Sequence, residues 1–155
     1  HTAHGEFKLN AYHEKNAGVT HIALVKGTWN ANEEVLVRVH EPLSVIDLLE
    51  VDDHSHSWSI HDAMAAIAQA GKGVVVLLHR KNDASVLTER ILRARPRQPD
   101  KPVPDLRQHG IGAQILKDLG VSKMRLLATP RRMPSMTGFS LEVAGYLEPG
   151  NHIRK

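Results

Sequence analysis

The sequence predicts an α/β domain with a mixed sheet and flanking helices. Residues 74–78, V-V-V-L-L, form a continuous apolar run, which is typical of a strand buried on both faces. Segments with helical spacing of apolar residues come before and after this run, and another strand pattern follows the last of them. Such alternation of strands and helices indicates helices packed on a sheet.

The composition is that of a globular chain. Its 155 residues, 41% of them hydrophobic, suit one domain with a real core, spanning residues 1–155. No apolar run is long enough to cross a membrane and no secretory signal is visible, so we expect a cytoplasmic location. The opening His1-Thr-Ala-His-Gly, without a methionine, is interpreted as a cut from a longer protein. Cysteine is absent, which excludes disulfides and thiolate metal sites.

Three segments near the beginning alternate as strands do: residues 5–12, 21–26 and 35–40. Gly18 and residues 27–34 supply the turns between them. Because the three strands follow one another with short connections, we expect them to form an antiparallel meander.

Three helices are expected after these strands. The first begins at Ser59, with Asp62 as its capping partner, and ends at Gly71. The second covers residues 85–95 and is followed by a proline-rich loop at residues 95–104.

The third helix covers residues 105–119. Asp105 can cap its start, Gln108 can reach back from the third helical position, and Gly120 stands where a C-terminal cap belongs. Strands at residues 124–128 and 138–147 complete the predicted sheet.

Three motifs resemble one family. Residues 110–121 read G-I-G-A-Q-I-L-K-D-L-G-V, residues 21–27 read H-I-A-L-V-K-G, and residues 35–40 read V-L-V-R-V-H. These motifs are similar to those of GTP cyclohydrolase II, the entry enzyme of riboflavin biosynthesis. The resemblance implies the fold of that family and extends from Gly5 to about Val143.

The family uses zinc and magnesium, and its zinc ion is held by three cysteines. The resemblance places these cysteines at Leu43, His54 and His56 of this chain. His54 and His56 can still ligate a metal, and further candidates lie nearby in sequence: Asp52, Asp53 and His61. The alternative is a solvated polar loop, and with one ligand position changed to leucine we expect no bound cofactor.

The family's phosphate-binding loop corresponds to residues 79–87. Its three glycines are replaced by Asn82, Ala84 and Val86, so side chains stand where backbone must approach phosphate closely. Arg80 and Lys81 are basic and could contact another anion. The alternative is an exposed loop after a strand.

Other family positions are partly retained. Asp105 and Arg107 match the family's D-x-R, whose aspartate is a proposed general base and whose arginine is proposed to engage the phosphate. The alternative for Asp105 is a helix cap, and for Arg107 a solvated residue of the first turn. A family tyrosine is missing near Ala94. Arg131 and Arg132 keep a basic turn that could hold an anion.

Three functions are compatible with this pattern. The resemblance and its departures favour a degenerate, catalytically impaired domain, forming a homodimer and supporting or regulating a fused 3,4-dihydroxy-2-butanone 4-phosphate synthase. The second is an active hydrolase with a metal at His54 and His56. The third is a nucleic-acid-binding module, suggested by the pI near 9.3 and a basic cluster, Arg90, Arg93, Arg95, Arg97 and Lys101. Aromatic residues are only 4%, which argues against base stacking.

Overall fold

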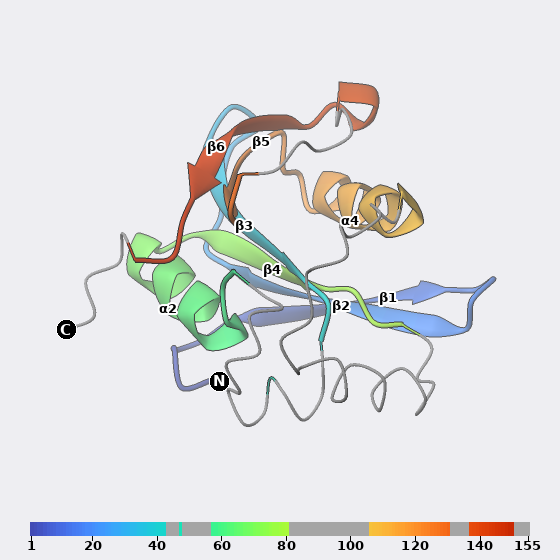
Figure 1. The fold of residues 1–155 in the computed structure, drawn as a ribbon, viewed down its shortest axis with the longest axis horizontal. Helices are drawn as coiled ribbons and strands as arrows, with labels where there is room; N and C mark the ends of the chain where they lie inside the picture. The colour runs from blue at the N-terminus through green and yellow to red at the C-terminus, as the bar shows by residue number, and fades with distance from the viewer. Residues whose placement is uncertain (43–46, 48–56, 81–105, 131–136, 151–155) are drawn as a thin grey trace, which may run out of the picture.

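The computed structural model of the protein describes residues 1–42, 47, 57–80, 106–130 and 137–150 (Figure 1). In chain order the elements are β1 (Lys8–Glu14), β2 (Val19–Lys26), β3 (Glu34–His40), α2 (Ile60–Ala70), β4 (Gly73–Leu77), α4 (Leu106–Asp118), β5 (Lys123–Leu127), the short 3-10 helix η1 (Thr137–Phe139) and β6 (Glu142–Leu147). The prediction of an α/β protein with a mixed sheet is confirmed.

The six strands form one sheet in the order β1-β2-β4-β3-β5-β6. The predicted meander is therefore wrong, because β4 lies between β2 and β3. β4 pairs antiparallel with β2 and parallel with β3. The reason is the apolar character of β4: Val74, Val75 and Val76 have no exposed surface, and such a strand must lie inside the sheet with neighbours on both sides.

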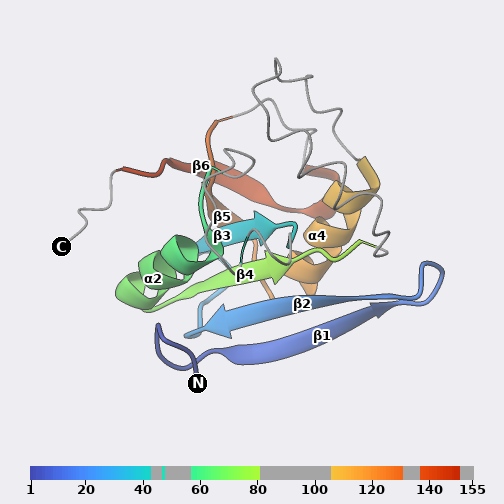
Figure 2. The ribbon, with the colours of Figure 1, turned by 60° about the horizontal axis from the view of Figure 1, so that its bottom comes forward.

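The two α-helices of the described residues, α2 and α4, cover opposite faces of the sheet (Figures 1 and 2). Val74 and Val76 of β4 belong to the same buried cluster as Ala113 and Leu116 of α4. Val75, which points to the other face, lies in a second cluster with residues of α2. The result is three layers, with the sheet in the middle, α2 on one face and α4 on the other.

Both helices end as their sequences predict. At α2 the Ser59 side chain accepts a hydrogen bond from the Asp62 amide, and Gly71 ends the helix with φ 77°. At α4 the Gly120 amide bonds to Lys117 O and the Val121 amide to Leu116 O, the pair of bonds that defines a Schellman cap. The predicted cap Asp105, the helix at residues 85–95 and the loop at residues 95–104 lie outside the described residues.

The ends of two strands differ from the prediction. β1 begins at Lys8 rather than at Gly5, because Gly5 has φ 91° and bonds to Thr2 in a turn. The last predicted strand is divided: its first part is the 3-10 turn η1, and Ser140, with φ 59°, interrupts the extended backbone before β6. No helix in the described ranges is both long enough and apolar enough to span a membrane.

Candidate functional site

The candidate site lies at the edge of the sheet where the parallel strands end. β3, β4, β5 and β6 are parallel neighbours, and ligands of open α/β sheets bind outside such carboxyl ends. β1 points the same way, as the arrowheads in Figure 2 show, so its last residue Glu14 lies toward this edge as well. Arg80 lies three residues after the end of β4 and pairs with Glu41, the residue after β3, at 2.7 Å between Nε and Oε1.

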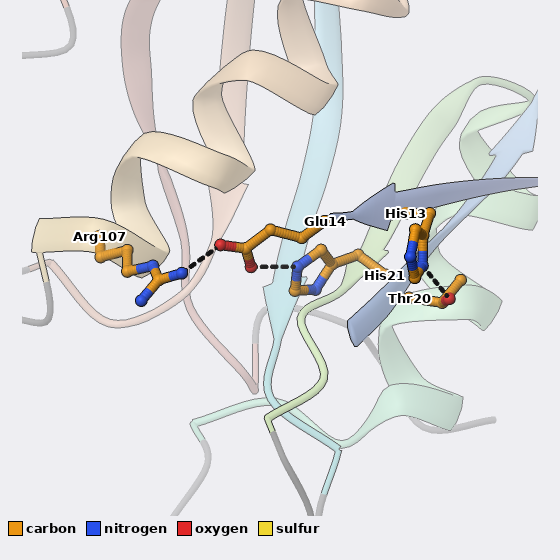
Figure 3. A network of polar contacts seen from close by, with 5 residues as sticks. All are labelled: His13, Glu14, Thr20, His21 and Arg107. Atoms are coloured by element: carbon orange, nitrogen blue, oxygen red, sulfur yellow. Dashed lines mark hydrogen bonds and ion pairs between the residues drawn. The ribbon is translucent and has the colours of Figure 1, made fainter. Parts of the chain in front are cut away.

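A three-residue contact joins the start of α4 to the first hairpin (Figure 3). Arg107, in the first turn of α4, donates from Nη2 to Oε1 of Glu14 at the end of β1. The other carboxylate oxygen of Glu14 lies 3.4 Å from Nε2 of His21 on β2. The Arg107 side chain is 64% exposed, Glu14 is 22% exposed and His21 only 3%. The contact therefore links an exposed residue, Arg107, through the partly buried Glu14 to the buried His21. We call these three residues the Glu14 bridge.

The chemistry of the Glu14 bridge follows from its donors and acceptor. An ionised carboxylate can only accept, so Nε2 of His21 carries the hydrogen. The Arg107 guanidinium, followed by the His21 ring, holds the pKa of Glu14 below its usual range. Nδ1 of His21 is buried and has no hydrogen-bond partner among the described residues. The neighbouring His13 points to the other face of the hairpin, where its Nδ1 lies 3.2 Å from the Thr20 hydroxyl.

A second polar group lies on the opposite face of the sheet, beside α2. Arg38 of β3 is 5% exposed and donates from Nη1 to Leu127 O at 2.9 Å and from Nη2 to Trp58 O at 3.0 Å. These bonds connect β3 to the end of β5 and to the residue before the Ser59 cap. From the face of the sheet that α2 covers, Arg38 thus holds the backbone at Leu127 and Trp58 in place beside the candidate site.

His40, at the end of β3, is 1% exposed and has both ring nitrogens engaged. Nδ1 lies 3.4 Å from Nη2 of Arg38, and Nε2 lies 2.8 Å from a carboxylate oxygen of Asp47. Because arginine can only donate and a carboxylate can only accept, Nδ1 accepts and Nε2 donates, which is the arrangement of a neutral ring. Burial lowers the pKa of His40, and the charge of Arg38 lowers it further, against an opposing effect of Asp47.

The neutral state of His40 predicts a loss of stability in mild acid. As pH falls below the ordinary histidine pKa of 6.5, the unfolded chain takes up a proton at position 40 before the folded chain does, so the free energy of unfolding decreases. Urea denaturation between pH 8 and pH 5 measures this decrease. We expect the free energy of unfolding to depend less steeply on pH in His40→Gln. In His13→Gln, the control at an exposed histidine, the pH dependence should be unchanged. Equal pH dependence in all three proteins would contradict the assignment.

The predicted site residues fall into two groups. Arg80 and Arg107 are described, and both lie at the candidate edge with a carboxylate partner. His54, His56, Lys81, Asp105, Arg131 and Arg132 lie outside the described residues, as do the further metal candidates Asp52 and Asp53. His61 is exposed on α2, with its ring 5.7 Å from that of His4. Within the described parts of the chain, no three His, Asp or Glu side chains are grouped as metal ligands.

Sequence analysis missed Glu14, His21, Arg38 and His40 as interacting residues. The signal for the last two was present, since an arginine and a histidine share one face of the otherwise apolar strand V-L-V-R-V-H. A charged residue on a buried strand face requires buried partners. No comparable signal marked Glu14, whose partner Arg107 is far away in the sequence.

The fold and the site define an α/β protein with a polar site at the carboxyl ends of parallel strands. The family model described as GTP cyclohydrolase II matches residues 1–148. The chain belongs to the GTP cyclohydrolase II family.

Among curated proteins, the chain is 47% identical over 147 residues to "3,4-dihydroxy-2-butanone 4-phosphate synthase" of Neisseria meningitidis serogroup A, covering 95% of this chain and 40% of that protein. It is 41% identical over 145 residues to the protein of the same name from Pseudomonas aeruginosa, covering 92% and 40%. It is 36% identical over 155 residues to "Riboflavin biosynthesis protein RibBA" of Aquifex aeolicus, covering 92% and 38%. The chain spans about two fifths of the length of these relatives.

Proposed function

We propose that this chain is a GTP cyclohydrolase II-like domain with impaired hydrolase activity that supports or regulates an attached 3,4-dihydroxy-2-butanone 4-phosphate synthase in riboflavin biosynthesis. One observation carries the proposal: relatives that are 47% and 48% identical are named for the synthase alone, while this chain matches only 40% of their length. The rest of such a protein is long enough to hold a separate synthase domain.

The residues of the chain support the impaired activity. The chain contains no cysteine, so it cannot build the three-cysteine zinc site of the family. The glycines of the phosphate-binding loop are replaced by residues with side chains. Arg107, which matches the arginine proposed to engage the substrate phosphate, is instead paired with the Glu14 carboxylate. A base and an arginine without metal and phosphate loop do not make a complete hydrolase site.

The hydrolase activity is tested directly. The untagged chain is assayed for formate release from GTP with added zinc and magnesium, beside a cysteine-containing member of the family, and its zinc content is measured. We expect no turnover by this chain and no stoichiometric zinc. Zinc together with turnover, both lost in His54→Ala, would overturn the proposal in favour of an active hydrolase with a histidine-based metal site.

The supporting role is tested in the longer polypeptide that the proposal implies. Synthase activity, melting temperature and oligomeric state are compared between this polypeptide and a version that lacks residues 1–155. We expect the deletion to lower at least one of the three, and a homodimer to dissociate if this domain provides the contact. If all three stay unchanged, the supporting role is wrong even where hydrolase activity is absent.

A further inference from the structure

Two histidine rings lie close together where the N-terminal turn meets α2 (Figures 1 and 2). His4 belongs to the turn, His61 lies in the first turn of α2, and the centroids of their rings are 5.7 Å apart. His61 is exposed and His4 is half-buried, so solvent reaches the pair. Within the described part of the chain, neither ring has a hydrogen-bond or ion-pair partner. The nitrogens of both rings are therefore available to a ligand.

The backbone that carries the two histidines is held in place. Thr2 and Gly5 close the N-terminal turn with two backbone hydrogen bonds, of 2.9 and 3.1 Å, and the His4 amide bonds to the Thr2 hydroxyl. Farther along the same segment, Phe7 packs in the buried cluster that contains α2. His61 lies on α2 itself, close to its capped start. The two imidazoles are thus positioned before any ligand binds, which lowers the entropic cost of binding.

The spacing of the two rings suits a shared metal ion. Zinc lies about 2.0–2.1 Å from an imidazole nitrogen that binds it, so two such nitrogens on one ion are at most about 4 Å apart. Rings whose centroids are 5.7 Å apart can bring facing nitrogens to this separation. Imidazole suits Zn²⁺, Ni²⁺ and Cu²⁺, whereas Mg²⁺ and Ca²⁺ prefer oxygen ligands. Asp62, in the same helical turn as His61, adds a negative charge that favours a cation.

We propose that His4 and His61 together bind a divalent transition-metal ion, with water completing its coordination, and that the ion links the N-terminal turn to α2. The site uses none of the positions that correspond to the family's zinc ligands, Leu43, His54 and His56. It does not depend on whether the domain supports a synthase. Structural zinc sites have four protein ligands, so a site with two holds its ion weakly and exchanges it. The purified chain is therefore still expected to contain no stoichiometric zinc.

The test is the binding of Ni²⁺ to the full chain at about pH 7.5, where an ordinary imidazole is neutral. Isothermal titration calorimetry measures the affinity, and NMR identifies the histidine rings whose resonances broaden beside the paramagnetic ion. We expect the rings of His4 and His61 to broaden first, at substoichiometric Ni²⁺. His4→Gln and His61→Gln should each bind Ni²⁺ at least about tenfold more weakly, because the second of two linked contacts strengthens the first.

The single variants also distinguish one shared site from two separate ones. In His4→Gln the ring of His61 should no longer broaden at the same Ni²⁺ concentration, and in His61→Gln the ring of His4 should stay sharp as well. If the remaining ring broadens as in the unchanged chain, each histidine binds Ni²⁺ independently and the proposal is wrong. A thermal melt without metal shows that each variant is folded.

Two further variants control the experiment. His13→Gln removes an exposed histidine of the first hairpin, whose ring lies beside Thr20, and should leave the Ni²⁺ affinity unchanged. The double variant His54→Gln/His56→Gln should leave the broadening at His4 and His61 unchanged. Loss of that broadening in the double variant would overturn the proposal, because the ion would then be bound at the positions of the family's zinc ligands. Equal Ni²⁺ affinity in His61→Gln and the unchanged chain would overturn it too.

Discussion

Replacing Arg38 with methionine is expected to lower the free energy of unfolding by about 3 kcal/mol. Arg38 is buried and donates to two backbone carbonyls, Leu127 O and Trp58 O. Methionine fills part of the space but leaves both buried carbonyls without this donor, and an unsatisfied buried acceptor costs about 1–3 kcal/mol. Urea denaturation of the two proteins at neutral pH measures the difference.

Arg125→Met is the matched control, because Arg125 lies on the adjacent strand β5 and is also paired. Its partner is the Glu34 side chain, at 2.6 Å between Nε and Oε1, and the arginine side chain is 40% exposed. An exposed pair of this kind contributes below about 1 kcal/mol. If Arg38→Met destabilises the protein no more than Arg125→Met does, the buried hydrogen bonds of Arg38 do not stabilise the fold as inferred here.

Replacing Gly27 with alanine is expected to cost about 3 kcal/mol for two separate reasons. Gly27 has φ 71°, a conformation that costs an L-residue about 1–2 kcal/mol. A Cβ at this position would also lie 2.4 Å from the carbonyl oxygen of Gly71, the C-cap of α2. Backbone cannot rotate away as a flexible side chain can, so either the end of β2 or the end of α2 must move.

Gly18→Ala separates the two costs of the Gly27 substitution. Gly18 has nearly the same backbone conformation, with φ 64°, but an added Cβ there meets no atom within 4 Å. Its cost should therefore be the conformational part alone, about 1–2 kcal/mol. Thermal denaturation measures the loss of stability in each variant. The amount by which the loss in Gly27→Ala exceeds the loss in Gly18→Ala is the cost of the steric clash with Gly71 O. Equal destabilisation by both variants would show that the collision is relieved without cost.

Local chemistry explains what the sequence could predict. Ser59, Gly71 and Gly120 were recognised as helix ends because capping depends on residues within one turn of the helix. The apolar run in β4 likewise indicated, by its own composition, a strand buried on both faces. Prediction was correct where the cause of a structure lies in a few adjacent residues.

Long-range pairing explains what the sequence could not predict. Nothing in β2 or β3 shows that β4 separates them, because the pairing depends on a crossover through α2. The Glu14 bridge was missed for the same reason: β1 was expected to end at residue 12, and Glu14 meets Arg107 only after α4 has packed on the sheet. The position of Arg107 in the first turn was predicted, but its carboxylate partner was not.

The order of the strands also determines when the first hairpin can join the rest of the molecule during synthesis. Within the described sheet, β2 is bonded to β1 on one side and to β4 on the other, so β4 alone connects the hairpin to the remaining strands. A two-stranded hairpin is at best marginally stable in water. The hairpin, which is synthesised before β4, must therefore wait on the ribosome until Gly73–Leu77 has emerged. Such non-local pairing slows folding, and the nascent hairpin exposes a strand edge throughout that delay.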